Sequence, residues 1–315
     1  MHKATTPLRL RSREDFLGML PYLLQYHPSD SVVLVHLTAS GRVATYADVA
    51  LGTPPAIVAD SVQQALAHTP TATVMIIGYG PVTAADDVAA IAEAVDRHVL
   101  VGAAGIVCGE AFYCLTPGCD CDAVTGVPFD PRSTAIAAAA TLRGDVALPS
   151  RADLLALAEP DPAAQAGVAA AIARIPVGDQ PTRAELDALL ERAMLDQRLT
   201  DDGAARMAWL LQQVPLRDAA WNATSHQMWQ RNLWLDLTRR VPDAYVSAPA
   251  ALAAWCAWMR GETTLALASA RRAATVNLNN PMLRIIVASI RANIPADQVV
   301  PVWQLTDESR SGRPA

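Results

Sequence analysis

A histidine, two serines and an aspartate lie within five residues, at His27, Ser29, Asp30 and Ser31, directly before an apolar run. A nucleophilic serine needs an imidazole to accept its proton and a carboxylate to orient that ring, so these residue types could form a hydrolase or transferase site. The members of such a site normally come from distant positions, and Pro-Ser-Asp is also an ordinary turn sequence. His27, Ser29 and Asp30 are therefore the candidate catalytic residues, with a plain turn as the alternative.

Four of the five cysteines fall within fourteen residues, at Cys108, Cys114, Cys119 and Cys121. Four thiolates can hold zinc in a tetrahedron, and the turn residues around Cys119 give the backbone the freedom that converging sulfurs need. The spacing C-x5-C-x4-C-x1-C lacks the paired C-x2-C knuckles of typical zinc sites. A disulfide or redox pair and free thiols in a reducing cytoplasm are the alternatives. Zinc is the one metal that the sequence suggests, and no other cofactor is predicted.

A glycine pair, Gly78-Tyr79-Gly80, follows an expected strand and precedes an expected helix. Such a turn resembles a phosphate-binding loop, because a helix N-terminus favours anions. The segment lacks both the third glycine of a dinucleotide fingerprint and the lysine of a P-loop. It predicts a tight turn, and a phosphate site only as an alternative.

Arginine and tryptophan are concentrated in the second half of the chain. Residues 217–291 hold nine arginines against four acidic residues, and all seven tryptophans lie from Trp209 onward. Guanidinium groups and aromatic rings are what nucleic-acid surfaces use, but tryptophans at helical spacing beside leucine and alanine are more typical of a core. A protein-binding groove between packed helices is favoured over a nucleic-acid surface. The candidate partner-binding residues are Arg231, Arg239, Arg240, Arg271 and Arg272.

Composition limits the class of protein. The chain has 315 residues, of which 52% are hydrophobic and 18% are charged. It contains no run of about 20 apolar residues that could cross a bilayer, and its first sixteen residues do not resemble a signal peptide. We therefore expect a cytoplasmic protein without a membrane span. Residues 1–150 carry a net charge of −6 and the remaining residues are balanced, which predicts two regions of different construction.

Strands and helices alternate in the first half. The β-branched run in Ser31–Leu37 is typical of a strand buried on both faces, and Ser40-Gly41 turns the chain into an alternating segment, so a hairpin is expected. The order β-β-α-β-α-β predicts an α/β sandwich domain with a mixed sheet over residues 1–145. The remaining expected elements are a strand at Val43–Leu51, a helix at Ala56–His68, a strand at Thr73–Ile77, a helix opened by a Thr83/Asp86 capping box, and a strand at Ile106–Leu115.

The second half, residues 146–315, is predicted to be an all-α, tetratricopeptide-like domain. Thr182 and Glu185 form a capping box before an apolar helical stripe, and prolines at both ends of residues 176–181 suggest a hinge. One helical hairpin before Pro281 is similar to a tetratricopeptide unit, without a repeat at 34 residues. Further helices are expected at Asp202–Gln213, Ala219–Thr238, Pro249–Arg260, Thr263–Val276 and Pro281–Ala292.

Several blocks of sequence together resemble one family. The segments Leu8–Phe16, Leu20–Val33, Cys114–Pro128, Leu148–Leu154 and Trp255–Pro281 look like the actinobacterial domain-of-unknown-function family 4192. Members of that family usually show Gly-Phe-His-Pro where this chain has Gln25-Tyr26-His27-Pro28. They usually show Cys-Cys-Pro where it has Cys119-Asp120-Cys121-Asp122, and this second departure counts against a shared metal site. The resemblance implies a fold and a high-GC bacterial source, but no catalytic residue, and it allows a DNA-linked or regulatory role.

Together these patterns predict a non-enzymatic interaction or regulatory protein of the cytoplasm. The α/β domain is the expected ligand-binding part, and the helical domain is expected to bind a protein partner. The alternatives are a hydrolase or transferase that uses the turn His27–Ser31, and a nucleic-acid-associated protein that uses the Arg/Trp-rich half.

Overall fold

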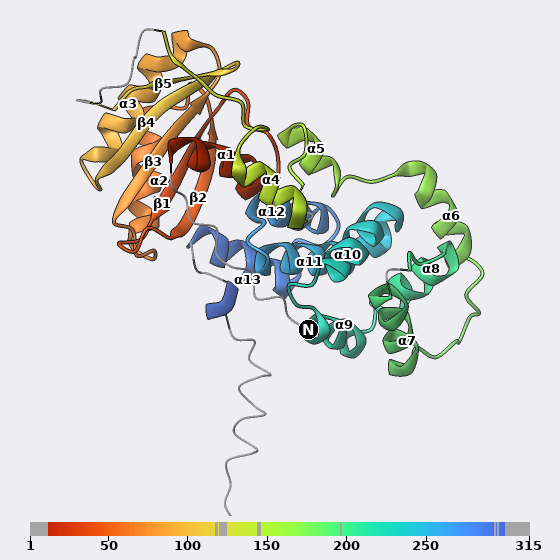
Figure 1. The fold of residues 1–315 in the computed structure, drawn as a ribbon. Coiled ribbons are helices and arrows are strands. Elements are labelled where there is room, and N and C mark those ends of the chain that lie inside the picture. The colour runs from red at the N-terminus through yellow and green to blue at the C-terminus, as the bar shows by residue number, and fades with distance from the viewer. Residues whose placement is uncertain are drawn as a thin grey trace, which may run out of the picture. The chain divides into compact units, whose positions relative to one another are not determined.

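The computed structural model describes residues 12–116, 119, 125–143, 146–195, 197–292, 294 and 296–299. The chain forms two compact units, Met1–Asp153 and Leu154–Ala315. The first unit contains a β-sheet and the second is helical, as the ribbon shows (Figure 1). The predicted succession of an α/β region with a mixed sheet and an all-α region is confirmed. A tetratricopeptide-like arrangement of the helices is not confirmed.

The first unit is built on one mixed sheet with the strand order β2-β1-β3-β4-β5-β6. Strands β3 and β4 pair in parallel, whereas the other neighbouring strands pair antiparallel. Strands β2, β3 and β4 therefore run the same way, and β1 runs against them. The strands are β1 Ser31–Leu37, β2 Val43–Ala50, β3 Thr73–Tyr79, β4 Val101–Cys108, β5 Ala111–Cys114 and β6 Val127–Pro128.

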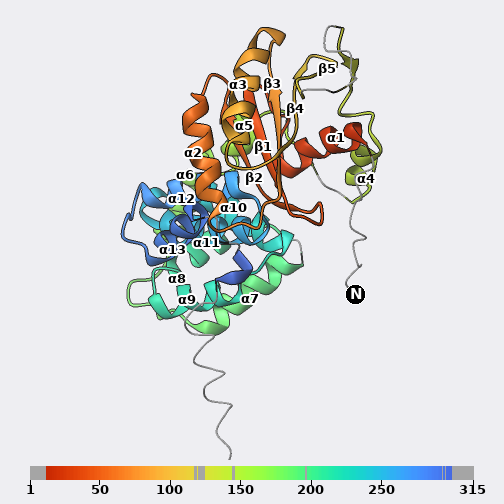
Figure 2. The same ribbon diagram turned by 90° about the vertical axis from the view of Figure 1, so that its left-hand side faces the viewer.

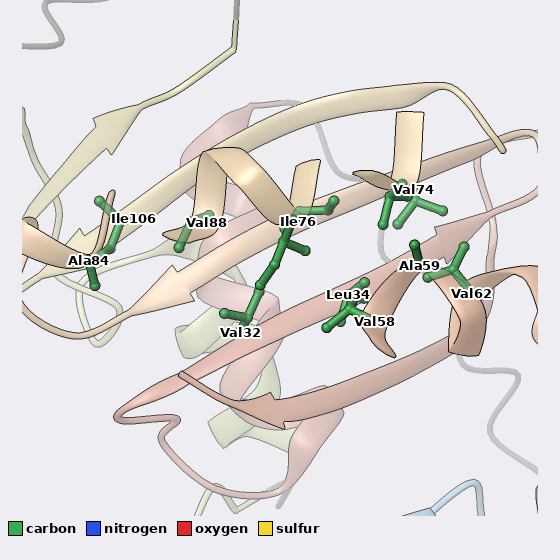
Figure 3. Close-up of a cluster of buried hydrophobic side chains, with 12 residues drawn as sticks. Val32, Leu34, Val58, Ala59, Val62, Val74, Ile76, Ala84, Val88 and Ile106 are labelled. Carbon is green, nitrogen blue, oxygen red and sulfur yellow. The ribbon is translucent and has the colours of Figure 1, made fainter. Parts of the chain in front are cut away.

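Helices cover both faces of this sheet (Figure 2). On one face, α2 (Pro55–Leu66) and α3 (Ala85–Asp96) bury valine and isoleucine side chains against alternate residues of β1, β3 and β4 (Figure 3). On the other face lie α1 (Arg13–Leu24) and α4 (Ala135–Arg143). Because both faces are covered, β1 is a continuous apolar run rather than an alternating one.

Two expectations for this unit were wrong. The single strand expected at Ile106–Leu115 is the hairpin of β4 and β5, which turns at Gly109 with a φ of 60°. The glycines inside β4 weaken the strand pattern of this segment in the sequence. Gly105 is required because a Cβ there would overlap the ring of Phe112. The Thr83 capping box is absent, because a 3-10 turn, η1 (Val82–Ala84), precedes α3 and no side chain caps either element.

The second unit is all-helical from α6 onward, and α5 lies at the boundary between the units. The Thr182/Glu185 capping box is confirmed. The segment 176–181 lies within this unit, between α6 and α7, and the hinge there stays a prediction. The helices are α5 Arg151–Ala156, α6 Pro162–Ile172, α7 Arg183–Met194, α8 Asp201–Leu210, α9 Val214–Ala223, α10 Met228–Arg240, α11 Asp243–Met259, α12 Thr263–Ala274 and α13 Pro281–Arg291, followed by the 3-10 turn η2 Ala296–Gln298.

Two helix boundaries in this unit also differ from expectation. The single helix expected at Ala219–Thr238 is broken into α9 and α10. At the break, the Gln230 side chain accepts from the amide of Ser225 and donates to the carbonyl of Ala223, the last residue of α9. Helix α11 begins at Asp243 and contains Pro249 in its interior. Its nearly continuous burial stabilises the helix enough to offset the lost backbone hydrogen bond.

The tryptophans of the helical unit are largely core residues. Trp221, Trp234, Trp255 and Trp258 are buried, and two edge-to-face ring pairs join Trp221, Trp255 and Trp258 at centroid distances of 5.4 and 5.5 Å. These rings therefore stabilise the unit, as the helical spacing indicated. Within the part of the chain that the structure describes, no helix has the length and apolar character to cross a bilayer.

Candidate functional site

A cleft of about 430 Å³ opens in the first unit at the carboxyl ends of the parallel strands β3 and β4. This edge of a parallel pair is where open α/β sheets commonly bind ligands. Prolines from α1 and three loops form much of the wall, and polar groups come from His27, Ser29, Asp30, Tyr79 and Cys108. Three motifs that are separate in the sequence, the His27 turn, the Gly78–Gly80 turn and one of the clustered cysteines, therefore meet at one place.

The segment that carries His27 is held on both sides. Tyr26 is buried and its hydroxyl donates a hydrogen bond to the carboxylate of Asp48 on β2. The His27 amide donates to the carbonyl of Leu148 at 2.9 Å, and the Leu148 amide donates to the carbonyl of Gln25 at 2.8 Å. These contacts fix the turn between α1 and β1, so the side chains that it presents to the cleft have defined positions.

Asp30 and Gly80 lie beside one another where β1 begins and β3 ends. Asp30 has a φ of 47°, in the left-handed region that aspartate tolerates better than most residues. A Cβ on Gly80 would lie 2.9 Å from Leu51 Cδ2 and 3.9 Å from Asp30 Oδ1. The glycine therefore allows this close approach, and its amide donates to the carbonyl of Val107 at 3.1 Å. The phosphate-loop alternative gains no support, because that amide is already bound within the sheet.

Asp30 is the acidic side chain in the lining of the cleft. Its carboxylate makes no hydrogen bond or ion pair with any residue that the structure describes, and the residue is exposed. Burial, and secondarily the charge of Arg132, lower the pKa of His27 below its usual value, so this half-buried ring is neutral at pH 7. The cleft therefore offers a carboxylate and a neutral imidazole side by side in one wall.

Tyr79 adds a buried hydroxyl that the sequence did not single out. The residue is 8% exposed, and its hydroxyl has no hydrogen-bond partner among the described residues. Burial raises the pKa of this phenol. Its cross-strand neighbour Ser31 is also buried, with an unpartnered hydroxyl. Buried hydroxyls without partners are uncommon in native proteins, and the strand pairing that brings these two together cannot be read from the sequence.

Two of the four predicted zinc ligands, Cys108 and Cys114, lie apart on the hairpin of β4 and β5. Cys108 lies opposite Ala111 and Cys114 lies opposite Gly105, so the two cysteines are three residues apart along the hairpin. An odd offset places them on opposite faces, roughly 10 Å apart along the strand. Cys119 is exposed and Cys121 lies outside the described residues. Among the described residues, no group of three or more His, Cys, Asp or Glu side chains is placed to hold a metal ion. Zinc on the full four-cysteine set stays a prediction.

The arginines proposed to bind a partner are mostly engaged within the helical unit. Arg231 forms an ion pair of 2.6 Å with the buried Glu262, and Arg240, 4% exposed, donates to the carbonyls of Leu199 and Thr200. Arg272 pairs with Asp243, and Arg239 lies 4.0 Å from Asp161. Arg271 is exposed and has no partner in the described part of the chain. Most of these arginine side chains therefore bind groups within the helical unit itself.

The chain belongs to a family whose model, described as "Domain of unknown function (DUF4192)", matches residues 14–295. The match covers both units and confirms the resemblance carried by the sequence blocks. No curated protein and no solved structure matches the chain. The family therefore supplies no activity, and any account of function depends on the cleft.

Proposed function

Because membership of a family of unknown function assigns no activity, we propose from its own geometry that this chain is an interaction protein that binds a small molecule in the cleft of its first unit. The observation that carries the proposal is the meeting of His27, Asp30 and Tyr79 in one cleft of about 430 Å³. That volume lies within the usual range for small-molecule sites, which combine apolar walls with a few fixed polar groups.

The hydrogen bonding of the polar groups in the cleft favours binding over catalysis. In the described residues, the His27 ring forms no hydrogen bond with Ser29, Cys108 or any other side chain. A nucleophile and its base normally lie within hydrogen-bond reach of each other, although the contact can be looser before substrate binds. The arrangement supports recognition of a ligand without requiring a reaction.

A fragment screen by ligand-observed NMR tests this function on the full chain. Ser29 is exposed at the cleft, so Ser29→Trp fills the cleft without disturbing a buried side chain. Ser40→Trp is the matched control, because Ser40 is exposed in the turn at the far end of β1. We expect hits on the wild type and on Ser40→Trp that disappear with Ser29→Trp. A screen in which no hit depends on position 29 would contradict the proposal.

A hydrolase or transferase is the second candidate, favoured by one observation. His27 is neutral at pH 7 and shares the cleft with the hydroxyl of Ser29 and the thiol of Cys108, so a base and two nucleophiles face one space. Under this candidate, a fluorophosphonate or iodoacetamide probe labels Ser29 or Cys108 faster in the wild type than in His27→Gln. Equal labelling of both proteins at pH 7 would remove the candidate.

We further propose that the helical unit contacts a protein partner in the cytoplasm. Support comes from apolar side chains exposed on and beside α12 and α13, namely Leu267, Val276, Leu278 and Ile285, and from the exposed Arg271. Affinity purification from the native host, with and without nuclease, tests the partner class. Partners retained after nuclease treatment support protein binding, whereas loss of all of them would favour the nucleic-acid alternative.

A further inference from the structure

The hairpin of α12 and α13 exposes apolar and basic side chains together at its loop end. The two helices contact each other and both pack on α11. Val276 and Leu278 in the connecting loop are 43% and 77% exposed, and Ile285, early in α13, is 39% exposed. Arg271 in the last turn of α12 and Arg284 in the first turn of α13 are also exposed. We call these five residues the hairpin end. Large apolar side chains that are exposed close together, with polar groups around them, are typical of an interaction surface.

The arginines of the hairpin end differ from most others in the helical unit because they have no carboxylate partner. Neither Arg271 nor Arg284 forms an ion pair with any residue that the structure describes. Most other described arginines of this unit pair with an aspartate or glutamate, on its surface as well as in its interior. The positive charge of the hairpin end is therefore available to a partner.

The acidic residues near the hairpin do not cancel this charge. Glu262, directly before α12, is buried and is already bound to two arginines. Asp243, at the start of α11, is exposed but pairs with Arg272. Residues 263–299 hold four arginines against one acidic residue, Asp297. Solvent screens each of these exposed charges in the same way, and the sum over the hairpin remains positive.

The composition of the hairpin favours a protein segment over a nucleic acid or a lipid surface. Residues 260–300 contain no phenylalanine, tyrosine, tryptophan or histidine, so no ring is present there to stack on a base. The apolar face of α13 is not available for insertion into a bilayer, because Met282, Leu283 and Ile286 are buried. What remains exposed is a set of short apolar side chains beside guanidinium groups, which suits an apolar partner that carries carboxylates.

We infer that the hairpin end binds an acidic amphipathic helix of a partner protein. Its carboxylates would pair with Arg271 and Arg284, and its apolar side chains would cover Val276, Leu278 and Ile285. The inference rests on the proposed contact of the helical unit with a protein partner, and it narrows that partner to one chemical class. A helix meets both requirements because residues three and four apart lie on one face. The planar guanidinium group suits a carboxylate through two parallel hydrogen bonds.

A selection from peptides of random sequence tests this class without a known partner. We would select phage-displayed peptides on the full chain at low salt, sequence those that are retained, and measure the affinity of the most frequent ones as free peptides. We expect the retained peptides to be enriched in aspartate, glutamate and aliphatic residues relative to the starting library. Their affinity should fall as the salt concentration rises, because exposed charge pairs are screened.

Three variants at exposed positions assign the binding to the hairpin end. Arg284→Glu reverses one charge in the first turn of α13, where the helix dipole favours an acidic residue, so the fold is not weakened. Arg192→Glu is the matched control, because Arg192 on α7 is also exposed and forms no ion pair with the described residues. Leu278→Ser removes an apolar side chain from the loop. We expect Arg284→Glu and Leu278→Ser each to weaken binding about tenfold, and Arg192→Glu to leave it unchanged.

The outcomes distinguish the inference from the function on which it rests. If the retained peptides show no excess of acidic residues, or if Arg284→Glu binds them like the wild type, the acidic class is wrong. In that case binding that is weakened by Leu278→Ser still upholds a protein contact at the hairpin end. If no retained peptide depends on either position, the inference is overturned, and the affinity purification decides separately whether the helical unit has a partner.

Other occupants of the hairpin end are tested with the same variants. A short DNA duplex and phosphatidylserine–phosphatidylcholine vesicles should bind the wild type and Arg284→Glu equally weakly. Strong binding of either probe that is lost with Arg284→Glu would assign the surface to phosphate groups. Sedimentation of the wild type as a dimer that Leu278→Ser separates would assign it to a second copy of the chain. Either result would overturn the inference.

Discussion

Both units bury polar side chains, but they differ in which buried groups carry charge. In the helical unit, the buried carboxylate of Glu262 binds Arg231 and Arg260, whereas the fully buried hydroxyl of Ser269 has no partner in the described structure. In the sheet unit, the buried hydroxyls of Ser31 and Tyr79 have no partner among the described residues, and both residues lie at the strand ends beside the cleft. A buried charge that is paired depends on its partner for stability, whereas removing an unpartnered hydroxyl should cost little.

The largest effect on stability is expected at Glu262. This residue is 4% exposed and accepts hydrogen bonds from Arg231 at 2.6 Å and from Arg260 at 2.7 Å. Glu262→Gln keeps the shape but leaves two guanidinium groups without their anion, so the free energy of unfolding should fall by about 3 kcal/mol. Urea denaturation monitored by tryptophan fluorescence measures this loss.

An exposed ion pair provides the control for that experiment. Arg183 and Asp187 lie 2.7 Å apart on α7, but both side chains are largely solvated. Asp187→Asn should therefore lower the free energy of unfolding by only about 0.3 kcal/mol. Equal losses in the two variants would show that the buried network does not stabilise the helical unit as described.

The contrast between satisfied and unsatisfied hydroxyls is tested by removing one of each. Thr238 is fully buried and donates to the carbonyl of Trp234 at 2.7 Å, so Thr238→Val should cost about 1 kcal/mol. Tyr79→Phe removes a hydroxyl that bonds to none of the described residues, and its effect should lie within about 0.5 kcal/mol of zero or be stabilising. Thermal denaturation of both variants checks the difference. A loss from Tyr79→Phe as large as that from Thr238→Val would mean that the tyrosine is already satisfied.

The smallest expected effect is a pH dependence of the protein's stability that arises from His27. Burial lowers the pKa of this ring in the folded protein relative to the unfolded chain. A lowered histidine pKa contributes stability above the unfolded value of about 6.5, and this contribution is lost as the pH falls through the folded value. The stability of the wild type relative to His27→Gln should therefore decrease as the pH falls below about 6.5.

Thermal denaturation from pH 7.5 to 5 follows this difference, with the exposed His98→Gln as the control. His36 is also buried with a lowered pKa and affects both proteins alike, so comparing variants isolates His27. A constant difference between wild type and His27→Gln across this range would show that burial does not hold the ring neutral.

The sequence predicted the elements with strong local patterns. The β-branched run of β1, its hairpin with β2 and the capping box of α7 are each encoded by nearby residues, and the structure confirms them. The hairpin β4–β5 was missed because glycine and alanine carry little strand signal, and the need for Gly105 becomes evident only when Phe112 lies across from it. The break between α9 and α10 depends on contacts of the Gln230 side chain with Ser225 and Ala223, which short helix patterns do not reveal.

The candidate site was visible in the sequence only as separate pieces. The turn at His27 and the glycines around Tyr79 each gave a short motif, but more than 40 residues lie between them in the chain. The antiparallel pairing of β1 with β3 places Ser31 opposite Tyr79 and so joins the two motifs. The role of Tyr79 depends on a hydroxyl with no described partner, which no sequence pattern encodes.

The most direct test of the central claim, that this cleft is the ligand site, is a crystal structure of the full chain soaked with a hit from the fragment screen. The account predicts density for the fragment in the cleft, with a polar atom within hydrogen-bond distance of His27, Ser29 or Asp30 and its carbon atoms against the proline walls. Density for the fragment at another site, with the cleft holding only water, would contradict the account.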